Sequence, residues 1–221
     1  MALTKHQRKN DSIITGILAK WYNKNTQKFR LKEMRKYAEI VTNHAPNKAT
    51  ILEIAPGPGY LSIELAKLGY TVIGVELSED FVKIEKHNAA IENVTVDFRH
   101  GNADKLPLIN ETVDFVVCTA AFKNFKYPVK ALHEMYRVLK TGGTALILDM
   151  NHNATKEDIN FEIENSNMKG FDRFFTKISF KTFLKSSAYT RDEFEQFIAK
   201  SPFKKSEIIK FGIGFQILLY K

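Results

Sequence analysis

The chain has 221 residues, of which 44% are hydrophobic and 26% are charged, and its formal net charge is +8 at pH 7. This composition excludes a disordered or fibrous chain and is typical of a globular protein with one domain plus additions, or with two small domains. The single cysteine, Cys118, excludes an internal disulfide. Because the sequence has no long apolar span and no apolar secretion core near its N-terminus, we expect a cytoplasmic protein without a membrane span.

The positive charge is spread along the chain. Lysines occur in separated pairs, such as Lys83 with Lys86 and Lys204 with Lys205, and no block of five basic residues is present. A lysine-rich, solvated surface explains this pattern better than a nucleic-acid-binding face, because charge alone marks only non-specific attraction. Nucleic acid is therefore an open but not a favoured partner.

The N-terminal part has the spacing of helices. Apolar residues recur at helical intervals from Ile13 to Leu18 and again from Leu31 to Val41. This pattern predicts one or two helices over residues 12–42. We expect residues 1–45 to form a helical cap on the domain that follows.

Strands then alternate with helices as far as residue 150. The predicted strands are short apolar runs at residues 50–54, 71–75, 94–99, 113–119 and 144–150. One predicted helix extends to Leu68, a second begins after the cap Ser78, and a third runs from Pro128 to Lys140, ahead of Gly142 and Gly143. The alternation predicts an α/β fold, with a Rossmann-like, doubly wound and mostly parallel sheet.

The segment after the fifth predicted strand is rich in phenylalanine. Residues 155–186 have a helical pattern, and we expect residues 153–188 to form a helical insertion in a domain that spans 46–221. The stretch 171–183 is either a lid over an apolar substrate or ordinary helix core. Its phenylalanines are Phe171, Phe174, Phe175, Phe180 and Phe183.

The C-terminal residues predict one more helix and a hairpin. Thr190 and Glu193 form the pattern of a capping box, which marks a helix start. Residues 206–210 and 215–221 read as two strands joined through 212–214, which predicts an antiparallel hairpin at the sheet edge.

A glycine-rich turn follows the first predicted strand. Residues 55–59 read Ala-Pro-Gly-Pro-Gly, and Gly57 and Gly59 allow the backbone to approach a ligand closely. A dinucleotide site would need a third glycine, which is missing here. In addition, Glu53 ends the strand beside the turn, where a carboxylate suits a cationic ligand better than a pyrophosphate. The turn therefore favours a ligand with a positive charge and no phosphate.

Further polar residues follow the other predicted strands. A ligand of an open parallel sheet binds beyond the carboxyl ends of the strands, which selects the segments after each of them. Glu76 ends the second strand, where a carboxylate can accept hydrogen bonds from two ribose hydroxyls. Leu77 and Thr119 also lie at strand ends. Asn102 and the Ala103 N–H follow the third strand, where they could bind the edge of an adenine.

Five motifs occur in a familiar order. They are the glycine turn, Glu76, residues 101–107, residues 113–115 and residues 137–143. Together they resemble the successive motifs of class I S-adenosylmethionine (SAM)-dependent methyltransferases, and they are similar to the small-molecule enzymes of ubiquinone and sterol pathways. The resemblance covers residues 50–150. It implies SAM as the cofactor, bound by Glu53, Ala55, Gly57, Gly59, Glu76, Leu77, Asn102, Ala103 and Thr119.

Two residues depart from the family pattern. Ala55 stands where the family usually has its first glycine, and alanine is tolerable there if that backbone position keeps a negative φ. Asn102 stands where the family usually has aspartate, and its amide oxygen still accepts a hydrogen bond, but without charge. We expect SAM to bind despite both changes.

The resemblance implies no universal catalytic residue, because the transfer of a methyl group depends chiefly on alignment. Candidates for a catalytic role are Tyr22 in the N-terminal helices, Lys123 after the fourth strand and His152 after the fifth. Phe122, Asn124 and Phe125 are further candidates for the acceptor pocket. Cys118, inside an apolar strand, is expected to be a core residue, and no cluster with the spacing of metal ligands is present.

The favoured function is SAM-dependent methyl transfer to a small, partly apolar molecule. An RNA or protein methyltransferase is an alternative because of the positive charge. A non-catalytic SAM-binding protein is another, because of Ala55 and Asn102. A nicotinamide oxidoreductase is more distant, since the dinucleotide fingerprint is incomplete.

Overall fold

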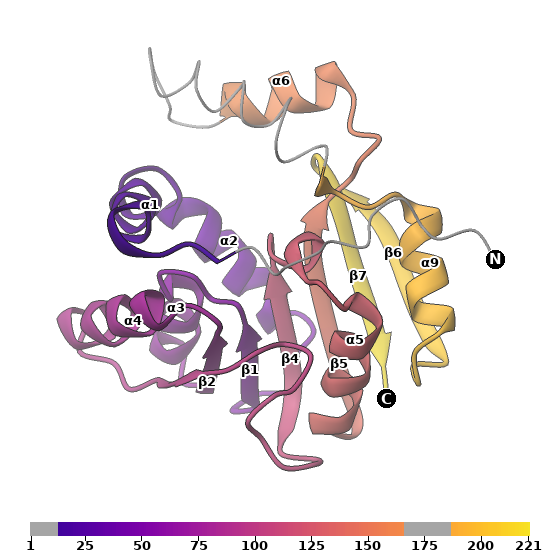
Figure 1. Cartoon of the computed structure of the whole chain (residues 1–221), viewed down its shortest axis with the longest axis horizontal. Helices are drawn as coiled ribbons and strands as arrows, with labels where there is room; N and C mark the ends of the chain where they lie inside the picture. Colours follow the sequence, from indigo (N-terminus) through magenta and orange to yellow (C-terminus); the bar gives the residue numbers. More distant parts are fainter. Residues whose placement is uncertain (1–12, 166–186) are drawn as a thin grey trace.

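The computed structural model describes residues 13–165 and 187–221. Within these ranges the chain forms one sheet and two layers of helices (Figure 1). The predicted lid stretch 171–183 and its five phenylalanines lie outside the described residues.

The sheet has seven strands in the order β3-β2-β1-β4-β5-β7-β6. The first five run parallel, while β7 pairs antiparallel with both β5 and β6. This confirms the predicted Rossmann-like sheet with a C-terminal antiparallel hairpin. The strands are β1 (Thr50–Ile54), β2 (Thr71–Glu76), β3 (Asp97–His100), β4 (Val113–Thr119), β5 (Leu139–Met150), β6 (Lys205–Phe211) and β7 (Gly214–Tyr220).

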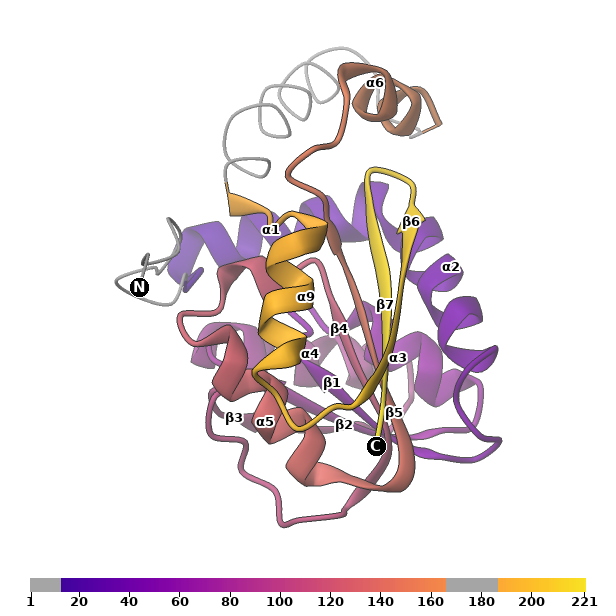
Figure 2. The same ribbon diagram turned by 90° about the vertical axis from the view of Figure 1, so that its right-hand side faces the viewer.

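Helices cover both faces of the sheet, as Figure 2 shows from the side: α2 and α3 lie on one face, and α5 and α9 on the other. Helix α6 lies beyond the end of the sheet, apart from both layers. The helices are α1 (Gly16–Phe29), α2 (Leu31–Thr42), α3 (Tyr60–Lys67), α4 (Glu79–Ile91), α5 (Pro128–Val138), α6 (Lys156–Asn165) and α9 (Arg191–Ala199), with a 3₁₀ turn η1 (Phe122–Asn124). None of the helices within the described ranges is long and apolar enough to cross a membrane.

The central strands are buried on both sides. Phe115 and Val117 of β4 belong to the apolar cluster under α2 and α3, while Val116 and Cys118 belong to the cluster under α5 and α9. Successive residues of a strand point to opposite faces, so a strand covered on both sides must be apolar throughout. The prediction of Cys118 as a core residue is confirmed.

The third strand begins later than its sequence predicts. Residues 94–99 were expected to be extended, but β3 starts at Asp97. The reason lies in the end of α4, where Asn93 takes a left-handed φ of 54° and the Val94 N–H donates to the carbonyl of Ala89. This hydrogen bond satisfies one of the last carbonyls of α4, so Val94 belongs to the helix end rather than to the strand.

Helix α5, predicted to run from Pro128 to Lys140, ends earlier than predicted. It stops at Val138, and β5 begins immediately at Leu139, which pairs with Val113. Gly142 and Gly143 therefore lie within the strand instead of beyond a helix end. Gly142 donates its N–H to the Lys221 carbonyl, and the Lys221 N–H donates to Gly143. These partners are remote in sequence, so the local pattern of glycine after a helix was misleading.

The C-terminal elements follow their sequence closely. Thr190 and Glu193 form the predicted capping box at the start of α9. The hairpin turns at Gly212 and Ile213, and β7 begins one residue earlier than predicted, at Gly214. A Cβ atom placed on Gly214 would lie 2.1 Å from the carbonyl oxygen of Asp149 in β5. The close approach of the two strands therefore requires glycine at this position.

We predict that Gly214→Ala lowers the free energy of unfolding by about 3 kcal/mol, because backbone atoms of β5 cannot move aside without disturbing the sheet. Urea denaturation measures the change. Gly69→Ala is the control: nothing lies within 4 Å of its Cβ position, so only the left-handed φ of 88° opposes the substitution, at about 1–2 kcal/mol. Equal losses for the two variants would contradict the proposed crowding.

Candidate functional site

A pocket lies where the order of the parallel strands reverses, between the carboxyl ends of β1 and β4. Such a reversal leaves a crevice, because the connections from the two strands pass to opposite faces of the sheet. The pocket is walled by the loops after β1, β2, β3 and β4 and by the two N-terminal helices. Its lining residues are Ile14, Tyr22, Thr26, Arg30, Met34, Ile54, Ala55, Pro56, Gly57, Pro58, Val75, Glu76, Leu77, Phe81, Gly101, Asn102, Ala103, Thr119, Ala120, Ala121, Asn124 and Phe125.

Hydrogen bonds from two neighbouring elements hold the glycine turn in place. The Gly57 N–H donates to Glu76 Oε2 at 3.1 Å, and the Asn88 side chain of α4 donates to the Pro58 carbonyl at 2.9 Å. Gly59 caps α3 in a left-handed conformation, with φ at 81°. These contacts fix the turn in an open arc along the pocket wall.

Ala55 does not have the negative φ that was the condition for tolerating alanine at this position. Its φ is 56°, in the left-handed region that favours glycine, and its N–H donates to the Val75 carbonyl at 2.8 Å. The condition is therefore not met, and the alanine carries the strain of a left-handed backbone conformation. Ala120, at the end of β4, also has a positive φ of 55°. Two strained alanines thus lie at the ends of adjacent strands, and both line the pocket.

Among the described residues that line the pocket, Glu76 is the only one with a carboxylate. One oxygen accepts from the Gly57 N–H and the other from the Ser78 N–H at 2.9 Å. Burial raises the pKa of Glu76 above its usual value, while the hydrogen bonds from Ser78, Gly57 and Leu77 counter part of that rise. The side chain is thus fixed at the end of β2, and each oxygen keeps a lone pair that can accept from a ligand.

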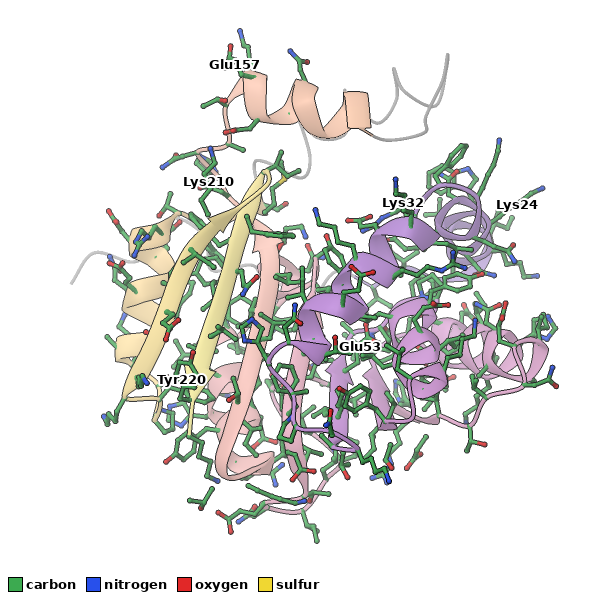
Figure 3. The ribbon with its side chains drawn as sticks, turned by 180° about the vertical axis from the view of Figure 1, so that it is seen from behind. Lys24, Lys32, Glu53, Glu157, Lys210 and Tyr220 are labelled. Atoms are coloured by element: carbon green, nitrogen blue, oxygen red, sulfur yellow. The ribbon has the colours of Figure 1, made fainter. Side chains whose placement is uncertain are left out.

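Glu53 lies behind the pocket wall rather than in it. Its carboxylate is buried in the body of the domain (Figure 3) and accepts a short hydrogen bond of 2.5 Å from the Ser62 hydroxyl of α3. Burial raises the pKa of Glu53 to about 7, with a further contribution from the charge of Glu76. Neither Glu53 nor Gly59 lines the pocket, so any effect of these two predicted residues on a ligand is exerted through the glycine turn.

Glu85 adds a third buried carboxyl group behind the turn. It lies on α4, is fully buried, and neither of its oxygens has a hydrogen-bond partner among the described residues. Burial, together with the charges of Glu76 and Glu53, raises the pKa of Glu85 to about 10. Glu85 is therefore protonated at neutral pH. Its Cγ lies 3.1 Å from the Cβ position of Gly59, so a larger residue there would push against the Glu85 side chain.

The other predicted cofactor residues lie together on the pocket wall. Leu77, Asn102, Ala103 and Thr119 all line it. The Asn102 side-chain oxygen accepts from the Asp104 N–H at 3.3 Å, which orients its amide. The structure therefore brings seven of the nine predicted residues to one pocket; the seven are Ala55, Gly57, Glu76, Leu77, Asn102, Ala103 and Thr119.

One face of α1 closes the pocket from above the sheet. Tyr22, Thr26 and Arg30 lie four residues apart and all line the pocket. Arg30 donates to the Tyr22 hydroxyl at 2.9 Å and to Glu33 at 2.7 Å. We predicted only Tyr22. Thr26 and Arg30 share its helical spacing, and this spacing is the sequence signal that could have identified them.

Lys123 and His152 do not line the pocket. Lys123 is buried, and its ammonium group lies 2.9 Å from Asp149 Oδ1 and also donates to the Ala120 carbonyl. The second Asp149 oxygen accepts the Lys123 N–H at 2.8 Å. This ion pair ties the loop after β4 to β5. The His152 N–H donates to the Tyr189 carbonyl at 3.0 Å, which ties the end of β5 to the segment before α9.

The other candidates after β4 separate into one core residue and two residues that line the pocket. Phe122 is buried and stacks on Phe194, whereas Asn124 and Phe125 line the pocket. Among the described residues, no group of three or more histidine, cysteine or acidic side chains is arranged to bind a metal ion.

Comparison with known proteins relates this site to a family. Residues 52–147 match the family model described as a methyltransferase domain. The ubiquinone/menaquinone biosynthesis C-methyltransferase UbiE of Blochmanniella floridana is 30% identical over 151 residues, which are 66% of this chain and 54% of that protein. A demethylmenaquinone methyltransferase of Deinococcus radiodurans is 29% identical over 108 residues, 48% of this chain and 44% of that protein. The chain thus spans about half the length of these relatives.

Solved structures show the same fold over nearly the whole chain. A protein of Methanococcus maripaludis, provisionally described as a SAM-dependent methyltransferase, superposes with a TM-score of 0.75 and 22% identity, covering 97% of this chain and 96% of that one. Residues 52–147 thus form a domain of the methyltransferase-domain family, and the relatives and solved structures that resemble it are described as methyltransferases. The cofactor of that family is SAM.

The pocket fits that cofactor. In the part of the chain that the structure describes, the lining has one carboxylate, Glu76, whose remaining lone pairs could accept from ribose hydroxyls, and one cationic side chain, Arg30. The rest is apolar or weakly polar, which suits an adenine, a thioether-like chain and a methyl group. A pyrophosphate would instead lie beside Glu76, with Glu53 behind the wall, and both would repel it. The chemistry of the lining thus favours a nucleoside cofactor without phosphates.

The buried carboxyl of Glu85 makes a pH prediction. An acid whose pKa is raised on folding holds a proton that the unfolded chain releases, so stability declines as pH rises above the unfolded value, near 4.5. The decline is at most about 1.4 kcal/mol per pH unit. We predict that Glu85→Gln removes much of this decline between pH 5 and pH 8 and raises the melting temperature at pH 8.

Thermal unfolding across this pH range tests the prediction. The exposed Glu157 on α6 (Figure 3) supplies the control, because Glu157→Gln should leave the pH profile of the parent protein unchanged. If Glu85→Gln kept the parent slope, Glu85 would not be held in its protonated form.

Proposed function

We propose that this chain is a cytoplasmic SAM-dependent methyltransferase that acts on a small, partly apolar molecule. The observation that carries the proposal is the pocket itself, in which a fixed carboxylate and a glycine turn form one side and apolar and aromatic groups form the other. When bound, SAM supplies an electrophilic methyl group on a sulfonium.

The chain's own residues would bind and align the reactants. Glu76 and Gly57 both line the pocket. Glu76 would accept hydrogen bonds from the ribose hydroxyls, and the turn at Gly57 would let the backbone approach the methionine part. The carboxylate of Glu76, with Glu53 behind the wall, gives this side of the pocket a negative bias that favours a cation, whereas Glu85 is protonated at neutral pH and adds no charge. Most of the rate enhancement in this reaction comes from alignment and the exclusion of water.

The acceptor would enter between α1 and the loop after β4. Tyr22, Met34 and Phe125 offer apolar surface there, and Asn124 and Arg30 offer polar groups. Tyr22 is the one catalytic candidate whose side chain lines the pocket, whereas the buried pair of Lys123 with Asp149 suits a role in positioning the loop. The names of the relatives, ubiquinone/menaquinone and demethylmenaquinone methyltransferases, support an aromatic, quinone-like acceptor.

Labelled SAM tests the activity and the class of acceptor together. The protein is incubated with methyl-labelled SAM and three fractions of a cell extract: lipids, RNA and protein. We expect label in the organic-soluble fraction, because the pocket is walled by apolar and aromatic side chains. Label in RNA would favour the alternative that the +8 net charge suggests. Cofactor binding without any labelled product would favour a non-catalytic SAM-binding protein.

A substitution at Glu76 tests where the cofactor binds. We predict that Glu76→Ala weakens binding of S-adenosylhomocysteine by about 1–3 kcal/mol, through loss of the charge-assisted hydrogen bonds to the ribose. Isothermal titration calorimetry measures the change. Glu79→Ala is the matched control, because it removes the same charge from an exposed position three residues away. Unchanged affinity in a folded Glu76→Ala protein would place the cofactor elsewhere.

A further inference from the structure

The outward face of α1 is apolar at its start and basic further along. Ile17, Leu18 and Trp21 are 85%, 66% and 60% exposed, and Ile13 just before the helix is 52% exposed. Lys24 and Lys28 continue the same face over the next two turns, and Lys24 points away from the body of the protein (Figure 3). The helix contains no acidic residue. Large apolar side chains gathered in this way on a surface mark a site of interaction.

The opposite face of the same helix is already occupied. Ala19 and Thr26 are buried, and Tyr22, Thr26 and Arg30 wall the pocket. Helix α1 already packs one face against the protein. A lack of packing therefore does not explain the exposure of Ile17, Leu18 and Trp21 on the other face. Their exposure on a well-anchored helix points to an external partner.

We propose that α1 docks the protein on an anionic lipid surface. Interfacial helices combine a small apolar group that enters the boundary of the acyl chains, a tryptophan at the level of the headgroups, and lysines that attract anionic lipids. Ile17 and Leu18 supply the first, Trp21 the second, and Lys20, Lys24 and Lys28 the third. Asp80 does not oppose this attraction strongly, since its carboxylate accepts the Gly16 N–H at 2.7 Å and lies near Lys83.

A second copy of the chain fits this face less well. A two-fold dimer brings the same surface of each copy together, so the lysines of α1 would meet one another around a small apolar patch. An anionic lipid surface pairs with those lysines instead. Docking through α1 would also place the pocket wall next to the bilayer, where an apolar acceptor could enter. The docking needs neither the cofactor nor the reaction. A test of docking is therefore independent of a test of the proposed function.

The chain carries its own reporter for this proposal, because Trp21 is its only tryptophan. Emission from the parent protein is recorded with vesicles of phosphatidylcholine mixed with phosphatidylglycerol, and with vesicles of phosphatidylcholine alone. We expect a shift to shorter wavelength with the anionic vesicles only, weakened by salt. The double variant Ile17→Asn with Leu18→Asn should lower the fraction that co-sediments with these vesicles by about tenfold or more.

Ile109→Asn is the matched control, since Ile109 is 80% exposed on a loop before β4 and should not alter vesicle binding. Thermal unfolding verifies that each variant is folded. No shift with anionic vesicles would overturn the proposal, as would an equal shift with phosphatidylcholine alone. Short-wavelength emission in the absence of vesicles would also overturn it. If that emission did not depend on protein concentration, the chain itself would cover Trp21. If it grew with protein concentration, a second copy of the chain would cover Trp21.

Discussion

The hydrogen bond between the Gly57 N–H and the Glu76 carboxylate joins the two halves of the binding site. It connects the turn after β1 to the end of β2, and the Ser78 N–H binds the other oxygen of the same carboxylate. Because Glu76 is anchored at both oxygens, the turn and the start of α4 keep a fixed distance from it. The pocket wall is therefore formed before any ligand arrives, which lowers the entropic cost of binding.

Buried acids surround this bond and set its electrostatic environment. Glu53 and Glu85 lie behind the turn; the charge of Glu76 raises the pKa of both, and the charge of Glu53 further raises the pKa of Glu85. Such a cluster opposes stability in the absence of a ligand, since carboxyl groups are held away from water. It is compatible with a cationic cofactor on the other side of the turn, whose charge would favour the ionised forms. The positive φ values of Ala55 and Ala120 are a second form of strain at the same edge of the sheet.

The sequence was sufficient to predict the sheet, because strand periodicity and glycine or serine caps are local signals. β4 was predicted to the residue, and Glu76 was identified because a strand end is readable from its apolar run. The errors have remote causes: Val94 is held by the end of α4, and Gly142 by the C-terminal Lys221. The burial of Glu53 under Ser62, and the closure of the pocket by Thr26 and Arg30, likewise depend on how helices pack and not on the local sequence.

The central claim is that this pocket binds the SAM nucleoside and not a dinucleotide. Calorimetric titration of the purified protein with S-adenosylhomocysteine, with NADH titrated in parallel, tests it most directly. A saturable micromolar interaction with S-adenosylhomocysteine and none with NADH is the predicted result. Binding of NADH instead, or of neither compound, would contradict the claim; binding of neither would mean that the strained turn at Ala55, or Asn102 in place of aspartate, no longer supports a nucleoside cofactor.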